Sequence, residues 1–393
     1  MNLRSLRGMF AAIGIAITGA TAAQADIIKV GVIGTMSGPF ALFGKNFKMG
    51  IDAYVAKHGA KVGPHEVQFI YRDLDAPNPA KAKAIAQELI IKDNVQYLAG
   101  IFFTPNAFAV APLLEESKTV LVIMNAATSS IVEKSPNIVR TSFSMWQNAV
   151  PAARVALKQG AKKAAVAVTD YGPGIDALNG FTKTFEANGG KVVESIRIPL
   201  STTDFAPIMQ RIKNSGADMI FAFSPGGPPT QGFMKAYVDN GLKAAGIKVI
   251  STGDIVTEPD LPGVGDAGLG ILSTYHYSVS HDSPENKEFL ELIKKNGASV
   301  DDVTMTAVAA FDGAHLIYKM IEATNGQRDP VKAIEVAKAM KWISPRGPVS
   351  IDPDTRHVRQ NVYLRVLEKA DGKYFNKELE TFPSQPDWAL SSK

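Results

Sequence analysis

Short apolar, β-branched runs alternate with longer segments of helical period from Asp26 onward. This alternation predicts strands at residues 28–33, 67–71, 97–100 and 120–124, and a second series at 164–169, 192–199, 219–223, 248–251 and 270–275. Strands that alternate with helices indicate parallel sheets covered on both faces. Because the series breaks near residues 140–147, the pattern predicts an α/β protein of two doubly wound lobes.

The last part of the chain has a different pattern. Asp282-Ser283-Pro284 predicts the start of a helix, since an N-cap residue is followed by proline in the first turn. Helical segments are expected at 303–323 and 330–340. Beyond them, residues 348–351 and 361–369 read as two strands around the turn Asp352-Pro353-Asp354, with no helix between them.

Residues 1–25 have the features of a secretory signal. Arg4 and Arg7 precede an apolar stretch over about residues 8–20, and Ala23-Gln24-Ala25 follows as a small-residue cleavage motif. The alternative, a membrane anchor, is disfavoured because the run is shorter than the roughly 20 residues that span a bilayer core. We therefore expect cleavage before Asp26 and an exported, soluble protein.

Charge and cysteine content exclude several functional classes. The 393 residues include 42 basic and 38 acidic ones, a formal charge of +4. This small, dispersed excess argues against nucleic acid as a partner, which would require basic residues gathered on one face. The absence of cysteine excludes disulfides, thiol nucleophiles and cysteine-bound metals.

The motifs of common enzymes are also missing. No G-x-G-x-x-G follows the first strand, and no P-loop, H-E-x-x-H or G-x-S-x-G occurs. The six histidines do not have metal-ligand spacing. Asp73 and Asp75 could form a carboxylate pair, but we expect them to cap the helix that begins near Pro79. The sequence therefore predicts a protein that is not an enzyme and has no cofactor or metal.

Small, hydroxyl-bearing and aromatic residues follow the predicted strands, where open α/β sheets bind their ligands. In the first series these segments are 35–44, 102–106 and 125–130, and in the second 170–174, 224–229 and 252–254. Hydroxyl and backbone donors suit a carboxylate, and each charge-assisted hydrogen bond contributes roughly 1.5–3 kcal/mol.

Four motifs carry a family resemblance: Met36-Ser37-Gly38-Pro39 with Phe43-Gly44, Ala127-Thr128, Asp170-Tyr171-Gly172, and Gly347-Pro348-Val349 through Asp352. In order and spacing, the chain from about Ile27 to Lys373 resembles the periplasmic leucine/isoleucine/valine-binding proteins of ABC importers. The resemblance implies two lobes joined by three crossovers and closing on a small ligand. It implies an N-terminal lobe of residues 26–142 plus 277–347 and a C-terminal lobe of 143–276 plus 348–393. It also implies a periplasmic monomer that delivers its ligand to permease subunits in the inner membrane.

The resemblance further implies roles for individual residues. Thr104 and Thr128 match hydroxyls that hold the ligand's carboxylate, and Ala127 gives a backbone contact. Phe43 matches a wall of the side-chain pocket, Tyr171 a tyrosine that covers the ligand, and Asp254 lies near an acidic residue that pairs with an α-ammonium group. Gly226 lies on a loop that approaches the ligand. The alternatives are a core position for Phe43, helix N-caps for the threonines, a turn position for Tyr171 and a capping or solvated position for Asp254.

Departures from the family pattern bear on the ligand. The family's small disulfide cannot form here, and Pro105 stands in the site where a residue with a free N–H or hydroxyl is common. Aromatic walls favour flat aromatic ligands by stacking, and the first lobe's pocket side contains four phenylalanines: Phe40, Phe43, Phe102 and Phe103.

Residues 344–356 resemble the branch of the family that takes up benzoate or hydroxycinnamate relatives. An aromatic carboxylate is therefore slightly favoured over a branched-chain or aromatic amino acid. A ligand-presenting sensor subunit is an alternative of another class. Whether Tyr275, His276 and Tyr277 face the cleft stays open.

Overall fold

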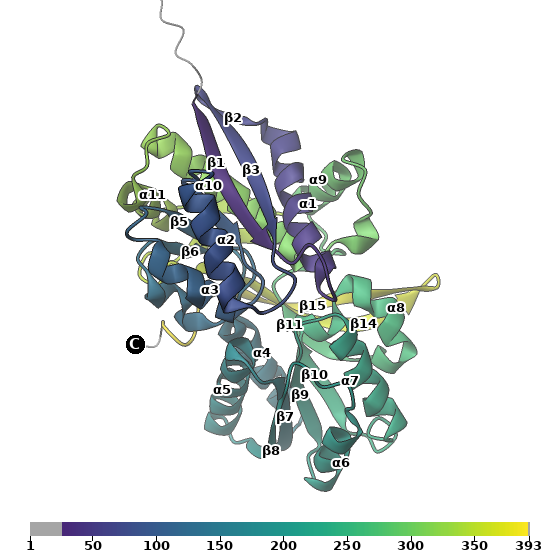
Figure 1. The fold of residues 1–393 in the computed structure, drawn as a ribbon. Coiled ribbons are helices and arrows are strands. Elements are labelled where there is room, and N and C mark those ends of the chain that lie inside the picture. The colour runs from purple at the N-terminus through teal and green to yellow at the C-terminus, as the bar shows by residue number, and fades with distance from the viewer. Residues whose placement is uncertain (1–25, 392–393) are drawn as a thin grey trace, which may run out of the picture.

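The computed structural model describes residues 26–391. The predicted signal peptide, residues 1–25, lies outside the described residues, so its cleavage stays a prediction. Within the described range, no helix combines the length and the apolar character needed to cross a membrane. Two sheets, each with helices on both faces, form an upper and a lower lobe in Figure 1. The predicted α/β architecture of two lobes is thereby confirmed.

The first lobe has a six-stranded sheet in the order β2-β3-β1-β4-β5-β6. Its strands are β1 (Ile27–Gly34), β2 (Lys61–Val62), β3 (His65–Asp73), β4 (Tyr97–Gly100), β5 (Val120–Ile123) and β6 (Ile138–Arg140). Its helices are α1 (Ala41–His58), α2 (Pro79–Ile91), α3 (Thr104–Val110), α9 (Pro284–Lys295), α10 (Met305–Thr324) and α11 (Pro330–Lys338). Successive side chains of a strand point to opposite faces: Tyr97 and Ala99 pack with α1 and α10, whereas Leu98 packs with α2 and α3.

The second lobe is built in the same way. Its sheet of nine strands runs β12-β13-β14-β11-β10-β9-β7-β8, with β15 paired to β14. The parallel part comprises β7 (Lys163–Thr169), β8 (Lys191–Ile198), β9 (Met219–Phe223), β10 (Lys248–Thr252) and β11 (Leu272–Tyr275). Its helices are α4 (Met145–Lys158), α5 (Gly172–Ala187), α6 (Ala206–Asn214), α7 (Pro228–Asp239) and α8 (Leu261–Val264). Val166 packs against α4 and α5, and Ala165 packs against α6 and α7.

Antiparallel strands from the end of the chain join the lobes. These are β12 (Lys341–Ser344), β13 (Gly347–Ile351), β14 (Val358–Ala370) and β15 (Lys373–Gln385), drawn in green to yellow in Figure 1. Val358 at the start of β14 belongs to the core of the first lobe, and Leu364 and Leu367 belong to cores of the second. By pairing, β12 and β13 extend the second sheet, but Val349 and Ile351 pack into the first core. The predicted lobe boundaries therefore stay a proposal.

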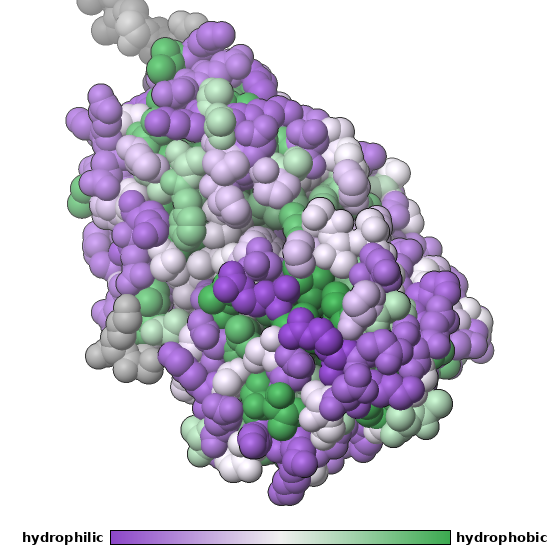
Figure 2. Space-filling view, turned by 60° about the horizontal axis from the view of Figure 1, so that its bottom comes forward, coloured by the Kyte–Doolittle hydropathy of each residue, from purple (hydrophilic) through white to green (hydrophobic). Residues whose placement is uncertain are grey.

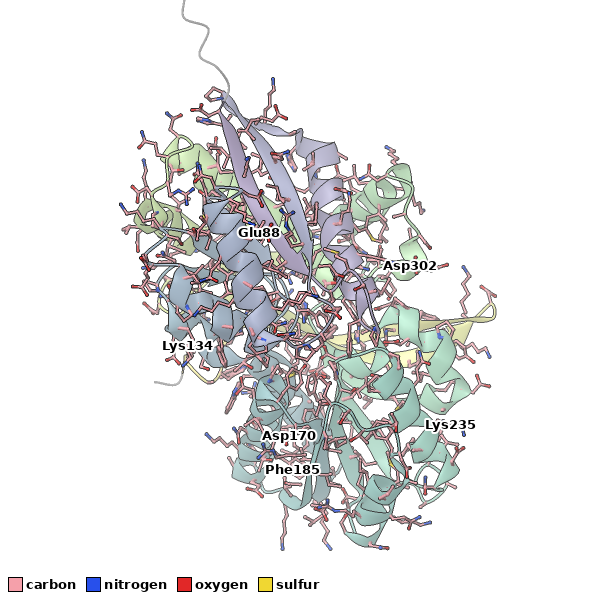
Figure 3. All side chains as sticks on the ribbon, viewed as in Figure 1. Glu88, Lys134, Asp170, Phe185, Lys235 and Asp302 are labelled. Atoms are coloured by element: carbon pink, nitrogen blue, oxygen red, sulfur yellow. The ribbon has the colours of Figure 1, made fainter. Side chains whose placement is uncertain are left out.

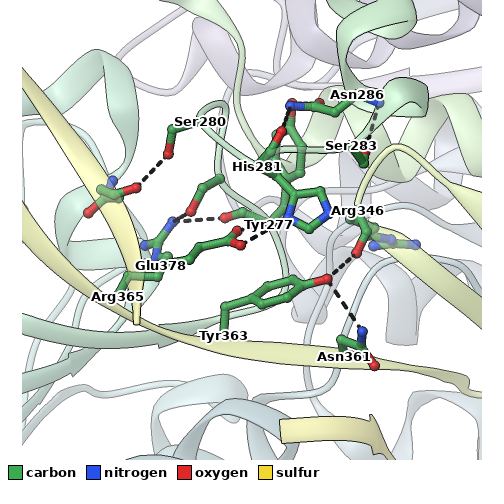
Figure 4. A network of polar contacts seen from close by, with 12 residues as sticks. Tyr277, Ser280, His281, Ser283, Asn286, Arg346, Asn361, Tyr363, Arg365 and Glu378 are labelled. Atoms are coloured by element: carbon green, nitrogen blue, oxygen red, sulfur yellow. Dashed lines mark hydrogen bonds and ion pairs between the residues drawn. The ribbon is translucent and has the colours of Figure 1, made fainter. Parts of the chain in front are cut away.

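Three fully buried arginines lie in or beside the segments that cross between the lobes: Arg140, Arg346 and Arg365. The first crossing is the segment 141–144 between β6 and α4, and Arg140 is the residue before it. Arg346 donates to the carbonyl oxygens of Thr141 and, at 3.1 Å, of Ser142 in that crossing. Arg365 of β14 donates to the carbonyl oxygen of Tyr277 in the second crossing at 2.8 Å (Figure 4). A guanidinium carries five N–H donors, so each arginine can satisfy carbonyl groups that no strand pairs.

Several local predictions are corrected. Asp73 and Asp75 do not cap α2; the Asn78 side chain accepts from the Lys81 N–H and is the cap. Asp73 instead accepts from the Met36 N–H at 2.8 Å and so holds the loop after β1, and Asp75 pairs with Lys81. Strands β2, β6, β12 and β15 were not predicted, because short or polar strands have weak patterns. Ser283 does cap α9 as predicted.

The buried ion pair at the hinge predicts a large effect on stability. Arg346 Nη2 lies 2.8 Å from Asp312 Oδ2 of α10, and both side chains are completely buried. Asp312→Asn leaves the arginine charge buried and unpaired, so we expect a loss of about 3–5 kcal/mol in unfolding free energy. Urea titration followed by circular dichroism measures it. The control, Glu322→Gln, breaks an exposed pair on the same helix and should cost less than about 1 kcal/mol. Equal effects of the two changes would contradict the assignment.

Candidate ligand-binding site

A small, nearly filled pocket with a cavity volume of about 10 Å³ lies between the lobes. The residues that line it are Phe102, Asn125, Ala127, Phe143, Met145, Tyr171, Pro173, Phe223, Pro225 and Asp254. Most of them follow the carboxyl ends of β4, β5, β7, β9 and β10. This is where open α/β sheets place their ligands. The pocket therefore lies where the strand ends of the two lobes face each other, a region crowded with side chains in Figure 3.

Aromatic rings form its apolar wall. Phe43 of α1 stacks on Phe102, with ring centroids 4.8 Å apart and planes inclined by 27°. Phe103 meets Tyr171 of the opposite lobe edge-on at 6.4 Å, and Tyr171 stacks on Phe223 at 6.0 Å. Such ring pairs contribute about 0.5–1.5 kcal/mol each beyond their buried area. The wall is therefore a cluster shared by both lobes.

Gly226 allows the lobes to approach each other at Phe43. It has a φ of +84°, in the region that favours glycine, and an added Cβ would lie 2.7 Å from the Phe43 ring. Phe43 is buried, but it lies behind Phe102 and not among the lining residues. The expected proximity of Phe43 and Gly226 to the site holds, and their contact with a ligand stays a prediction.

Thr104 and Thr128 meet at the edge of the pocket. Their hydroxyl oxygens are 3.0 Å apart and hydrogen-bonded, and both residues are buried. Neither hydroxyl caps a helix: Thr104 is the first residue of α3, and Thr128 precedes the 3₁₀ helix η2 (Ser129–Lys134) without a capping bond. The alternative of simple N-caps is therefore wrong. Gly172 at the start of α5 packs directly against the Thr128 hydroxyl, leaving no room for a Cβ.

Asp254 is the acidic group in the pocket wall. It lies in the 3₁₀ helix η3 (Gly253–Val256) and is only 3% exposed. Its carboxylate accepts from Thr252 at 2.9 Å and from the Tyr275 hydroxyl at 3.0 Å. Burial raises the pKa of Asp254 to about 6, although these hydrogen bonds and the charge of Arg365 act against the rise. The alternative of a solvated loop position is wrong.

The second crossing, residues 276–283 between β11 and α9, begins next to the pocket. Tyr275 reaches the pocket through Asp254, and its ring stacks beneath the Arg365 guanidinium at 5.0 Å. His276 is buried and stacks on Phe143 at 4.6 Å, and burial lowers its pKa well below the usual value, so its ring is neutral. Tyr277 donates to Asn286 at 3.0 Å, away from the lining residues. Tyr275 and His276 therefore support the pocket from behind, and Tyr277 belongs to the hinge.

Three of the eight predicted site residues line the pocket, and the ligand contacts of all eight stay predictions. Ala127, Tyr171 and Asp254 line the pocket, and Thr104, Thr128, Phe43 and Gly226 surround it. Pro105 is partly buried in the first turn of α3 and is not among the lining residues. Phe143 and Met145 were missed as pocket residues, since they lie in and directly after the first crossing and not at a strand end. The break in the strand–helix series at residues 140–147 was the feature of the sequence that could have indicated these two residues.

Comparisons with known proteins agree with this geometry. The family model of the periplasmic binding proteins matches residues 27–373. A protein of Brucella melitensis named Leu/Ile/Val-binding protein homolog 6 is 58% identical over 375 residues, covering 95% of this chain and 96% of the relative.

Two solved structures are also similar. One is the solute binding protein of an ABC transporter from R. palustris in complex with 4-hydroxybenzoate, with 71% identity, a TM-score of 0.93 and coverage of 94% of this chain and 100% of that one. The other, from Rhodopseudomonas palustris BisB5 in complex with 3,4-dihydroxybenzoic acid, has 42% identity, a TM-score of 0.87 and coverage of 93% and 99%. Two α/β lobes around a shared pocket, the family match and these full-length similarities show that the chain belongs to the periplasmic binding protein family.

Proposed function

We propose that the protein is the solute receptor of an ABC importer and captures a small aromatic carboxylate of the benzoate or hydroxycinnamate type between its lobes. The observation that carries the proposal is the aromatic wall: Phe102 of one lobe and Tyr171 and Phe223 of the other line the pocket, and Phe43 stacks on Phe102. A flat ring fits between such faces. The similar structures whose complexes contain 4-hydroxybenzoate and 3,4-dihydroxybenzoic acid support the same ligand class.

The two ends of the pocket have different chemistry. The Thr104 hydroxyl accepts from Thr128 and keeps its own proton to donate to the ligand's carboxylate. The Thr128 hydroxyl donates to the carboxylate by turning away from Thr104, and the backbone at Ala127 completes this end. Asp254, with Tyr275 behind it, supplies an acceptor for a hydroxyl on the ring. The lining residues hold no pairing of a base with a nucleophile, which suits a receptor that releases its ligand unchanged. We propose that the signal peptide is removed before Asp26, and that the periplasmic monomer delivers its ligand to an ABC permease.

An amino acid is the second candidate, and Asp254 is the observation that favours it. Its buried carboxylate has hydrogen bonds from two hydroxyls and no cation within ion-pair distance among the described residues. An α-ammonium group would compensate that charge.

Direct binding tests the proposal. We expect 4-hydroxybenzoate to raise the melting temperature and to bind stoichiometrically in calorimetry, because a ligand at 100 times its Kd stabilises the folded form by about 2.7 kcal/mol. Leucine and phenylalanine serve as the comparison ligands. Tight binding of either amino acid, with no response to 4-hydroxybenzoate, benzoate or coumarate, would overturn the assignment to aromatic acids.

Removing either threonine hydroxyl should remove one charge-assisted hydrogen bond to the ligand's carboxylate. Thr104→Val and Thr128→Val keep the side-chain volume and remove a hydroxyl, so we expect a loss of about 1.5–3 kcal/mol, or roughly 10- to 150-fold in Kd. Calorimetry with 4-hydroxybenzoate measures it. Thr203→Val, at an exposed position outside the pocket, is the matched control. Variants that bind within twofold of wild type would remove the threonines from the carboxylate site.

Asp254→Asn distinguishes the two ligand classes. For an aromatic acid, the change should cost little with benzoate and more with 4-hydroxybenzoate, whose ring hydroxyl loses a charged acceptor. For an amino acid, it should cost several kcal/mol, on the order of a removed partner in a buried ion pair. Asp239→Asn, in an exposed ion pair of the same lobe, is the control. Equal losses with benzoate and 4-hydroxybenzoate would contradict the assigned position of the ring hydroxyl.

The pH dependence of benzoate binding gives a second measure of the same group. A carboxyl group whose pKa is raised in the closed form, here to about 6, binds protons more tightly there than in an open form with an ordinary pKa. This contribution to closure is present at low pH and is lost as the pH rises through 6. Benzoate affinity should therefore increase between pH 8 and pH 5.5, and Asp254→Asn should weaken that dependence. An amino acid would show the opposite slope, because its ammonium group requires the ionised carboxylate.

A further inference from the structure

The turn that carries Thr128 is held by the next residue, Ser129, whose hydroxyl, backbone N–H and carbonyl oxygen all have partners. Ser129 donates its hydroxyl to Asp387 and its backbone N–H to Asp176 Oδ2 at 2.7 Å. Its carbonyl oxygen lies 3.1 Å from His357 Nε2. The carbonyl oxygen of Thr128 itself accepts from Arg140 Nη2 at 2.6 Å. The position of the Thr128 hydroxyl therefore depends on four partners.

Three of the four partners come from outside the parallel core of the second lobe. Arg140 ends β6, His357 precedes β14 and Asp387 follows β15. Burial lowers the pKa of His357 to about 3, so its ring is neutral. Arg140 donates to Nδ1 at 3.1 Å, and the proton of the neutral ring is therefore on Nε2, directed at Ser129 and Asp387. These three partners leave the backbone N–H of Ser129 for Asp176.

Asp176 reaches the turn from the other lobe. It lies on α5, which follows β7, one turn beyond Tyr171 and Pro173 of the pocket wall. Gly172 at the start of the same helix packs against Thr128. In Figure 1, α5 lies in the lower lobe directly below α3 of the upper lobe. The hydrogen bond from Ser129 to Asp176 thus crosses the cleft, and it can exist only while the lobes are together.

The Asp176 carboxylate is mostly buried, and several neighbouring groups act on its pKa. Burial, together with the nearby charge of Asp387, raises its pKa to about 6. The Ser129 N–H, the Trp146 side chain of α4 and the charge of Arg140 act in the opposite direction. At neutral pH the group is ionised and accepts a charge-assisted hydrogen bond, stronger than a neutral one.

We propose that Asp176 is a positioning residue of the binding site, which joins the second lobe to the Thr128–Ser129 turn and so couples lobe closure to carboxylate recognition. This inference rests on the proposed function. Asp176 does not touch the pocket; it acts through Ser129 and thereby fixes the Thr128 hydroxyl. Because the contact forms only in the closed protein, it slows ligand release and leaves the stability of the open, ligand-free protein unchanged.

Stopped-flow release of 4-hydroxybenzoate and thermal unfolding test the inference together. For Asp176→Ala we expect dissociation to accelerate by about tenfold to a hundredfold, the effect of one hydrogen bond to a charged group. The melting temperature without ligand should match that of wild type. Asp176→Asn retains an acceptor oxygen and should recover most of the slow release. Asn179→Ala, an exposed change on the same helix, is the control and should release ligand like wild type.

Two results would overturn this inference and leave the proposed function intact. The first is normal ligand binding by wild type with unchanged ligand release from Asp176→Ala. The second is a melting temperature of Asp176→Ala that falls equally with and without ligand. The second would show a purely structural role. Absence of 4-hydroxybenzoate binding by wild type itself would overturn the proposed function and this inference with it.

Discussion

The structure depends on how the crossing segments satisfy their backbone carbonyl groups. Main chain that passes between two lobes leaves the pairing of a sheet, and buried carbonyls without donors are costly. Arg346 and Arg365 supply donors to the first and second crossings, and Arg140 supplies one to the turn at Thr128. Asp312 compensates the charge of Arg346, Glu258 at 3.6 Å that of Arg365, and the charges of Asp387 and Asp176 act on Arg140. A buried guanidinium needs such partners, so the hinge and its acidic neighbours form one unit.

Two of these buried arginines also connect the hinge to the binding site. Arg140 orders the turn of Thr128, and Arg365 stacks on Tyr275, which donates to Asp254. The Thr128 turn and Asp254 are thus each supported by a buried arginine and not by the ligand-facing loops alone. The apolar middle is different, because it is completed only where Phe103 meets Tyr171 and Phe43 meets Gly226 across the cleft. The Asp254 end is thus built within the second lobe, whereas the Thr128 turn and the aromatic middle receive contacts from both lobes.

The exterior shows a simpler balance. Hydrophilic residues cover most of the face drawn in Figure 2, with apolar residues scattered among them. Exposed ion pairs, such as that between Lys235 and Asp239, contribute little to stability. The energetically important charges are therefore the buried ones at the hinge.

The sequence by itself determined the two lobes, most parallel strands and the neighbourhood of the site, because side-chain periodicity and strand-end residues are local signals. It also indicated Ala127, Tyr171 and Asp254, which line the pocket. It did not indicate Phe143 and Met145, or the crossing of β14 from one core to the other. Nor could it bring Asp176 to Ser129, 47 residues apart. Those features arise from contacts between distant segments, and only the tertiary structure decides which buried donor meets which acceptor.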